Sequence, residues 1–150
     1  AFALDFLTGW VRRFNPRLDE FTAEAGLRRI LNFGHTIGHA IEAVTKYRRF
    51  KHGEAVGYGM LAAADIAERR RTLAPAARKA LSALIIQLGP LPSVADLSSK
   101  QVIDAVNRDK KVRKGKLHFV LPSSIGTVTI VDDVTTKQIN AALRRLSLRP

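Results

Sequence analysis

The sequence contains no cysteine among its 150 residues. Disulfide bonds and thiolate metal sites are therefore excluded, so any metal ion must bind to histidine or carboxylate side chains. No apolar run approaches the roughly 20 residues that a membrane-spanning helix needs. The first residues also lack the charge order of a signal peptide, because their arginines follow the apolar residues. These absences predict a cytoplasmic protein without a membrane segment.

Carboxylates are scarce as well. The chain has 13 Asp and Glu against 25 Lys and Arg, which gives a formal net charge of +12. This excess favours anionic partners such as phosphates, nucleic acid or acidic membrane surfaces, without selecting among them. Apolar residues make up 46% of the chain, a typical share for a globular protein. The composition therefore predicts one folded domain with a hydrophobic core.

Apolar periodicity predicts a mainly α-helical, multi-helix domain with one small β-hairpin. Helical spacing and capping signals predict helices at residues 2–14, 22–47, 75–88 and 135–146. They also predict a helix that begins at residue 53 and continues through the alanine-rich stretch after it, and a short helix that begins after Ser98 or Ser99. Two stretches of β-branched and apolar residues, 116–121 and 126–131, predict paired strands joined by a turn at 122–125.

Three of the four histidines lie within eighteen residues, at positions 35, 39 and 52. On a helix, His35 and His39 share one face because they are four residues apart. This face continues as a polar stripe made of Arg28, Asn32, His35, His39 and Glu42. The pattern favours a zinc site, since zinc commonly binds imidazole nitrogen. Hydrogen-bonded structural histidines are the alternative interpretation.

Gly34 and Gly38 flank these histidines inside the predicted helix. Each glycine costs a helix up to about 1 kcal/mol relative to alanine. Their presence predicts that a ligand or another stretch of backbone approaches the helix closely at this point.

A second cluster of charge precedes the predicted hairpin, where residues 108–116 read RDKKVRKGK. A lysine from such a loop can bind a phosphate group. A solvated basic loop is the simpler alternative.

Four blocks, GLRRILNFGHTIGHAIE, HGEAVGYGM, RDKK and VLPSSIGTVTIVDDV, occur in this order along the chain. Together they resemble the C-terminal domain of 3-dehydroquinate synthase, and the resemblance covers roughly residues 24–146. We therefore predict a C-terminal helical domain of this type at 21–150, preceded by an unmatched N-terminal helix at 1–20. Related sugar phosphate cyclases share much of the pattern.

The resemblance implies an enzyme of the shikimate pathway that converts 3-deoxy-D-arabino-heptulosonate 7-phosphate into 3-dehydroquinate and phosphate. It implies Zn²⁺ or Co²⁺ as the metal, NAD as the cofactor, a homodimer, and a sugar phosphate as substrate. Another sugar phosphate cyclase activity is the alternative within the same class.

The resemblance also assigns roles to individual residues. His35 and His52 match zinc ligands, and Glu24 and His39 match groups that transfer protons. The matches to substrate-binding positions are Arg28, Arg29, Ile30, Leu31, Asn32, and Lys110 or Lys111.

Members of this family are more than twice as long, and their N-terminal half binds NAD and supplies a glutamate as third zinc ligand. This sequence has no GxGxxG motif. We therefore expect a fragment, a separately encoded half or a degenerate copy that is inactive without an NAD domain from a partner. Glu42 or Glu54 can replace the glutamate or, as we expect, support the site indirectly.

Two functions of other classes remain open. One is a non-enzymatic basic module that binds nucleic acid or an anionic surface, although the sequence shows no recognition helix and no interleaving of aromatic and basic residues. The other is a helical scaffold whose former site is only structural.

Overall fold

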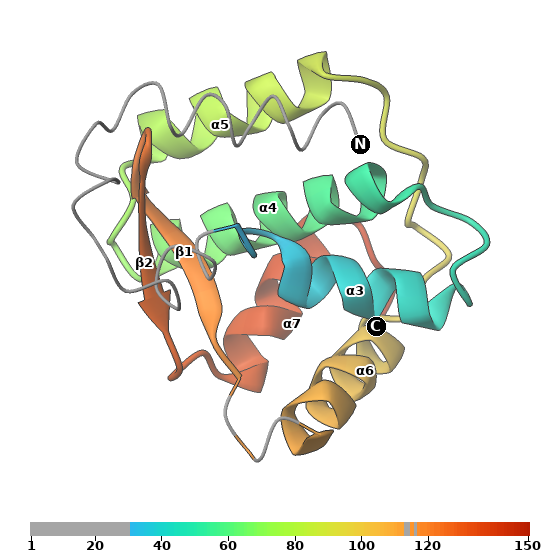
Figure 1. Cartoon of the computed structure of the whole chain (residues 1–150). Coiled ribbons are helices and arrows are strands. Elements are labelled where there is room, and N and C mark those ends of the chain that lie inside the picture. The colour runs from blue at the N-terminus through green and yellow to red at the C-terminus, as the bar shows by residue number, and fades with distance from the viewer. Residues whose placement is uncertain (1–30, 113–114, 116) are drawn as a thin grey trace.

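The computed structural model describes residues 31–112, 115 and 117–150. Within this part, five helices pack together and a two-stranded antiparallel hairpin lies at one side of them (Figure 1). The elements are α3 (His35–Val44), α4 (His52–Arg69), α5 (Pro75–Gln87), α6 (Ser99–Val112), β1 (Phe119–Ser124), β2 (Thr127–Val131) and α7 (Thr136–Arg145). The predicted mainly α-helical fold with one hairpin is confirmed. The predicted helix at 2–14 lies outside the described residues.

The sequence predicts one continuous helix at 22–47. Within the described residues 31–47, this prediction is wrong at both ends. Residues 31–34 form a turn, and α3 begins only at His35. Gly34 has a left-handed backbone with φ +82°, which interrupts a helix on its N-terminal side. After Val44, Lys46 and Tyr47 also take positive φ angles of 54° and 55°. These two residues turn the chain away from α3 and towards the start of α4.

α3 and α4 cross at glycines, so their backbones approach closely. A Cβ atom placed on Gly38 would lie 3.0 Å from the Val56 Cα atom. A Cβ atom on Gly59 would lie only 1.8 Å from the Gly34 carbonyl oxygen. The close approach predicted from Gly34 and Gly38 is therefore that of a second backbone, supplied by α4.

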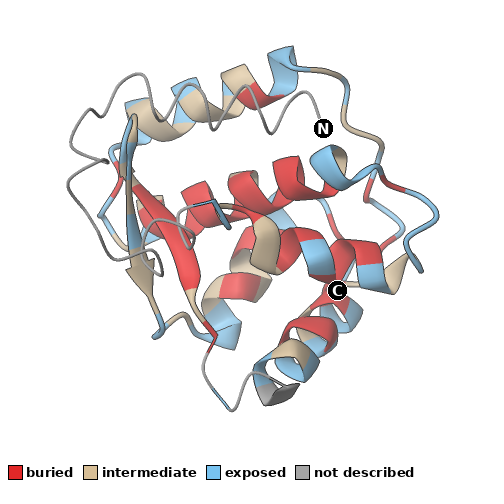
Figure 2. Cartoon of the chain, viewed as in Figure 1, coloured by how far each residue is buried: buried red, intermediate tan, exposed pale blue. Residues whose placement is uncertain are grey.

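α4 is the central helix of the described part, since it packs against α3, α5, α7 and β1. Figure 2 shows buried residues along most of its length. Its small side chains permit this packing, and Ala55, Ala62, Ala64 and Ala67 are completely inaccessible to solvent. Ile66 joins them in the core, which also receives residues from α3, α6 and α7.

Asp65 is a charged residue within this core, with a side chain that is only 4% exposed. It accepts a hydrogen bond from Arg69 Nε at 2.6 Å and lies 3.0 Å from Arg145 Nη1 of α7. A buried charge is tolerated when it is paired in this way. The Asp65 ion pairs therefore tie α4 to α7.

The hairpin differs from its prediction in length. β1 continues through Pro122 to Ser124, with an irregularity between these two residues, and the chain reverses at Ile125 and Gly126. Gly126 has φ +82°, a conformation that favours glycine. Proline is accommodated because a two-stranded sheet has only edge strands, where a missing N–H is tolerated.

The remaining helix boundaries agree with their sequence signals. Pro75 is the first residue of α5, and Ser99 is the first residue of α6. Thr135 caps α7, where its hydroxyl accepts a hydrogen bond from the Gln138 backbone N–H. None of the helices described here is long and apolar enough to cross a membrane.

Candidate metal centre

Three histidines converge where α3 and α4 begin. His35 is the first residue of α3, His39 follows one turn later, and His52 is the first residue of α4. The ring centroids lie 5.3 Å apart for His35 and His39, 5.2 Å for His35 and His52, and 5.7 Å for His39 and His52. One ring nitrogen from each residue lies within 4.8 Å of the other two. The glycine crossing of α3 and α4 brings these side chains together.

Two of the three rings are oriented by hydrogen bonds to their Nδ1 atoms. His35 Nδ1 lies 3.3 Å from the Phe33 carbonyl oxygen, and His52 Nδ1 lies 3.1 Å from Glu42 Oε1. These oxygens are acceptors, so each Nδ1 carries the proton and each Nε2 keeps its lone pair. Such an arrangement prepares a histidine for binding a metal through Nε2.

His39 differs from its two neighbours. Neither of its ring nitrogens has a hydrogen-bond partner among residues 31–112, 115 and 117–150, and the residue is exposed. Its ring is therefore free to turn towards a metal ion or towards a bound molecule.

The environment of His35 favours its neutral form. Burial is the largest influence and lowers the pKa of His35 below its ordinary value of 6.5. Neighbouring His39 and His52 lower this pKa further, while the Phe33 carbonyl and Glu42 act in the opposite direction. A neutral imidazole is the form that binds metal, so less proton competition is expected at His35.

The donor set fits zinc. Zinc in a catalytic site takes three protein ligands and keeps one open position, and imidazole is among its preferred ligands. Cobalt accepts the same donors. The three imidazoles gathered here include His35 and His52, the two residues for which the sequence predicts this role.

Other predicted site residues are only partly described. Glu24, Arg28, Arg29 and Ile30 lie outside the described residues. Leu31 and Asn32 belong to the turn before α3, where Leu31 is 50% exposed and Asn32 accepts the His35 backbone N–H at 3.0 Å. The backbone oxygen of Asn32 thus helps to define the start of the helix that carries the histidines.

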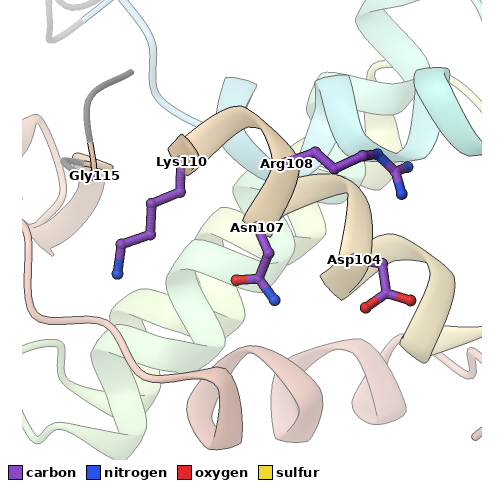
Figure 3. Close-up of a pocket in the computed structure, with 5 residues that line it drawn as sticks. All are labelled: Asp104, Asn107, Arg108, Lys110 and Gly115. Atoms are coloured by element: carbon purple, nitrogen blue, oxygen red, sulfur yellow. The ribbon is translucent and has the colours of Figure 1, made fainter. Parts of the chain in front are cut away.

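Lys110 lies near the end of α6, where it borders an open pocket with Asp104, Asn107, Arg108 and Gly115. Figure 3 shows Lys110 and Arg108 pointing to different sides of the helix. No hydrogen bond or ion pair recorded within the described part joins Lys110 to the histidines. Lys111 also belongs to α6, but its side chain is outside the described part.

Sequence reasoning did not find the Phe33 carbonyl, because a backbone acceptor leaves no signal in residue identity. The sequence predicts indirect roles for Glu42 and Glu54 at the site, and these roles stay predictions. Glu42 contacts His52, whereas Glu54 Oε2 accepts the Lys51 backbone N–H at 2.8 Å and caps α4.

Comparison with known proteins agrees with this geometry. Residues 17–112 match the family described as 3-dehydroquinate synthase C-terminal. The 3-dehydroquinate synthase of Nostoc sp. is 47% identical over 82% of this chain and 34% of its own length. The 2-epi-valiolone synthase of Actinosynnema mirum is 42% identical over 82% of this chain and 33% of its own length.

Solved structures show the same fold. The 2-epi-5-epi-valiolone synthase of Streptomyces hygroscopicus, solved with NAD⁺ and Zn²⁺ bound, is 30% identical with a TM-score of 0.67, over 93% of this chain and 38% of that one. A 2-deoxy-scyllo-inosose synthase complexed with carbaglucose-6-phosphate, NAD⁺ and Co²⁺ is 27% identical with a TM-score of 0.60, over 77% of this chain and 33% of that one.

The chain spans about a third of the length of the curated relatives it matches. Its matched region carries the histidine cluster and the glycine crossing beside it. The chain belongs to the 3-dehydroquinate synthase C-terminal family, whose relatives here are sugar phosphate cyclases.

Proposed function

We propose that this chain is the metal- and substrate-binding part of a 3-dehydroquinate synthase. That enzyme converts 3-deoxy-D-arabino-heptulosonate 7-phosphate into 3-dehydroquinate and phosphate. The observation that carries the proposal is the histidine cluster, in which His35 and His52 already have their Nδ1 atoms hydrogen-bonded. Identity of 47% to a 3-dehydroquinate synthase supports this choice of reaction.

His35 and His52 would hold zinc through their Nε2 atoms. Zinc bound there would act as a Lewis acid towards the substrate oxygens. His39 is exposed and without a hydrogen-bond partner in the described part, so it is suited to exchange a proton with the substrate through a ring nitrogen. Glu24 is proposed as the second group that transfers protons.

The substrate carries a carboxylate and a phosphate, and both require cationic or hydrogen-bonding partners. We propose that residues 28–32 and Lys110 or Lys111 supply them. Arg28, Arg29 and Lys110 would neutralise negative charge, whereas Leu31 and Asn32 would border the substrate beside the first turn of α3. This role accounts for part of the net charge of +12.

NAD is assigned to no residue of this chain, because the sequence has no glycine-rich dinucleotide motif. Bound NAD would accept a hydride from the substrate and return it later. We therefore propose that turnover requires an NAD-binding part, and that the complete enzyme is a homodimer.

A second candidate is another sugar phosphate cyclase activity. The 42% identity to a 2-epi-valiolone synthase favours it over unrelated enzymes. Both candidates use the same histidine cluster, so they differ in the sugar phosphate accepted.

Zinc titration tests the metal site directly. We expect the purified chain to bind one zinc ion. In His35→Ala and His52→Ala, affinity should fall by more than the roughly 10- to 100-fold typical of residues that only support a ligand. His118→Ala is the matched control, since His118 is the one histidine outside the cluster and its backbone oxygen keeps the bond from Thr36.

Equal affinity in all four proteins would contradict the site, as would failure of the unmodified chain to bind zinc. Phosphate release from 3-deoxy-D-arabino-heptulosonate 7-phosphate, measured after addition of zinc, NAD and a family N-terminal half, tests the reaction. Release from a different sugar phosphate alone would select the second candidate.

A further inference from the structure

Glu42 is a carboxylate placed where a core residue is expected. It lies on α3 next to Ile41, which is completely buried, and its own side chain is only 9% exposed. Burying a charged group is costly unless the group is paired and hydrogen-bonded. A retained buried charge therefore needs a specific partner.

That partner is His52. Glu42 Oε1 lies 3.1 Å from His52 Nδ1, and no lysine or arginine in the described part forms an ion pair with Glu42. The contact connects two helices across the loop at residues 45–51. The backbone oxygen of Glu42 also accepts the Tyr47 N–H at 2.8 Å, so the same residue anchors the beginning of this loop.

The contact determines which ring nitrogen of His52 is available. The carboxylate accepts a hydrogen bond, so the proton of neutral His52 resides on Nδ1 and the Nε2 lone pair is left available. A carboxylate in this position also makes the imidazole a stronger electron donor. An unrestrained ring would populate both tautomers and several orientations, since the His52 side chain is 46% exposed.

We propose that Glu42 is the positioning residue of the metal centre: it holds His52 with Nδ1 protonated and Nε2 directed to the metal. This inference rests on the proposed function only in taking His52 as a metal ligand. Glu42 is not among the three side chains that could hold a metal ion in the described part, so its proposed role is exerted through His52. Its buried position explains why it acts through His52 rather than as the third ligand.

The first test measures metal affinity. Zinc binding should weaken about 10-fold in Glu42→Gln, which keeps the shape and an acceptor oxygen, and up to about 100-fold in Glu42→Ala. Glu54→Gln is the matched control, because it removes a negative charge close to His52 while leaving an oxygen to cap Lys51. Circular dichroism establishes that each variant is folded.

A double-mutant cycle separates positioning from a general structural role. In a His52→Ala background, Glu42→Gln should have no further effect on the residual zinc affinity, because the residue it orients is gone. An undiminished further loss would show that Glu42 acts on the fold rather than on His52, and would overturn the proposal. Unchanged zinc affinity in folded Glu42→Gln and Glu42→Ala would also overturn it.

The tautomer of His52 gives a readout that needs no metal. In the metal-free chain, imidazole ¹⁵N chemical shifts should identify His52 with its proton on Nδ1, and Glu42→Ala should show a mixture. If the unmodified chain binds no zinc, the metal centre of the proposed function fails, whereas this spectrum still decides whether Glu42 sets the tautomer of His52. A His52 tautomer that is the same in both proteins would contradict it.

Discussion

His35 shows how burial and hydrogen bonding act together on one side chain. Burial disfavours the imidazolium form and lowers its pKa, while the bond to the Phe33 carbonyl holds the ring in a defined orientation. The result is a neutral imidazole that can bind a metal ion. In acid, its protonation lowers the stability of the folded chain. Protonation of His35 in the folded chain must work against this burial.

This effect predicts a pH dependence of stability in the metal-free chain. Because the folded-state pKa lies below the ordinary value of 6.5, the unfolded chain binds more protons between these two values. The contribution of neutral His35 to the free energy of unfolding is therefore fully present above about pH 6.5. It is lost as the pH falls through the folded-state pKa. Urea unfolding with a chelator present, from pH 8 to pH 5, measures the free energy of unfolding.

The matched variants are His35→Gln and His118→Gln. The first should reduce the loss of stability over this pH range, and the second should leave the His35 contribution in place. If His35→Gln retains the full pH dependence of the unmodified chain, protonation of His35 is not its source.

At the scale of elements, the site depends on the crossing of α3 and α4. Each helix contributes a histidine at its first residue, so the separation of the two helices sets the separation of the imidazoles. Gly34, Gly38 and Gly59 permit a contact between backbones that no side chain could enter without displacement. The same glycines therefore serve both packing and metal binding.

Gly59→Ala should separate the two helices. Its Cβ atom would overlap the Gly34 carbonyl oxygen at 1.8 Å, so we expect destabilisation beyond the upper end of the about 1–3 kcal/mol typical of overpacking. Zinc affinity should fall as well, because His35 and His52 move apart. Urea unfolding and zinc titration measure the two effects.

Gly53→Ala provides the control within the same helix. An added Cβ atom there meets no heavy atom within 4 Å, so the change should raise stability by about 0.4–1 kcal/mol through the unfolded state. Equal stability of the two variants would show that the α3–α4 contact is looser than described.

For the whole molecule, the question is what the net charge of +12 serves. Ion pairs such as Arg49–Asp96 and Arg70–Asp133 are neutral overall, so the excess comes from the other basic residues. This excess can bind a sugar phosphate at a metal centre or a nucleic acid on a basic surface. The two kinds of binding depend on different conditions. Zinc should matter for the first and salt for the second.

We expect calorimetry to show that zinc strengthens binding of 3-deoxy-D-arabino-heptulosonate 7-phosphate to this chain, relative to the chain with a chelator. Binding of random duplex DNA should be weak, independent of zinc and steeply reduced by salt, because it depends only on phosphate contacts. Tight DNA binding near physiological salt, together with zinc-independent sugar phosphate binding, would instead favour a basic binding module.

Much of the fold could be predicted from local signals. Pro75 and Thr135 mark helix starts through backbone chemistry that acts within one turn, and the β-branched residues before and after Gly126 indicate the hairpin. The turn at residues 31–34 could not be predicted in this way. From the sequence alone, Gly34 is predicted to lie inside a helix. Its role becomes visible only in the structure, where the α4 backbone packs against it.

The amino-acid sequence by itself determined the family, the residue types available to a metal and the cost that Gly34 and Gly38 impose on a helix. Only the tertiary structure decided that the three imidazoles meet, that α4 fills the space beside these glycines, and that Glu42 contacts His52. The physical reason is that composition and local propensity act within a few residues, whereas these contacts join helices separated by a loop whose path depends on packing.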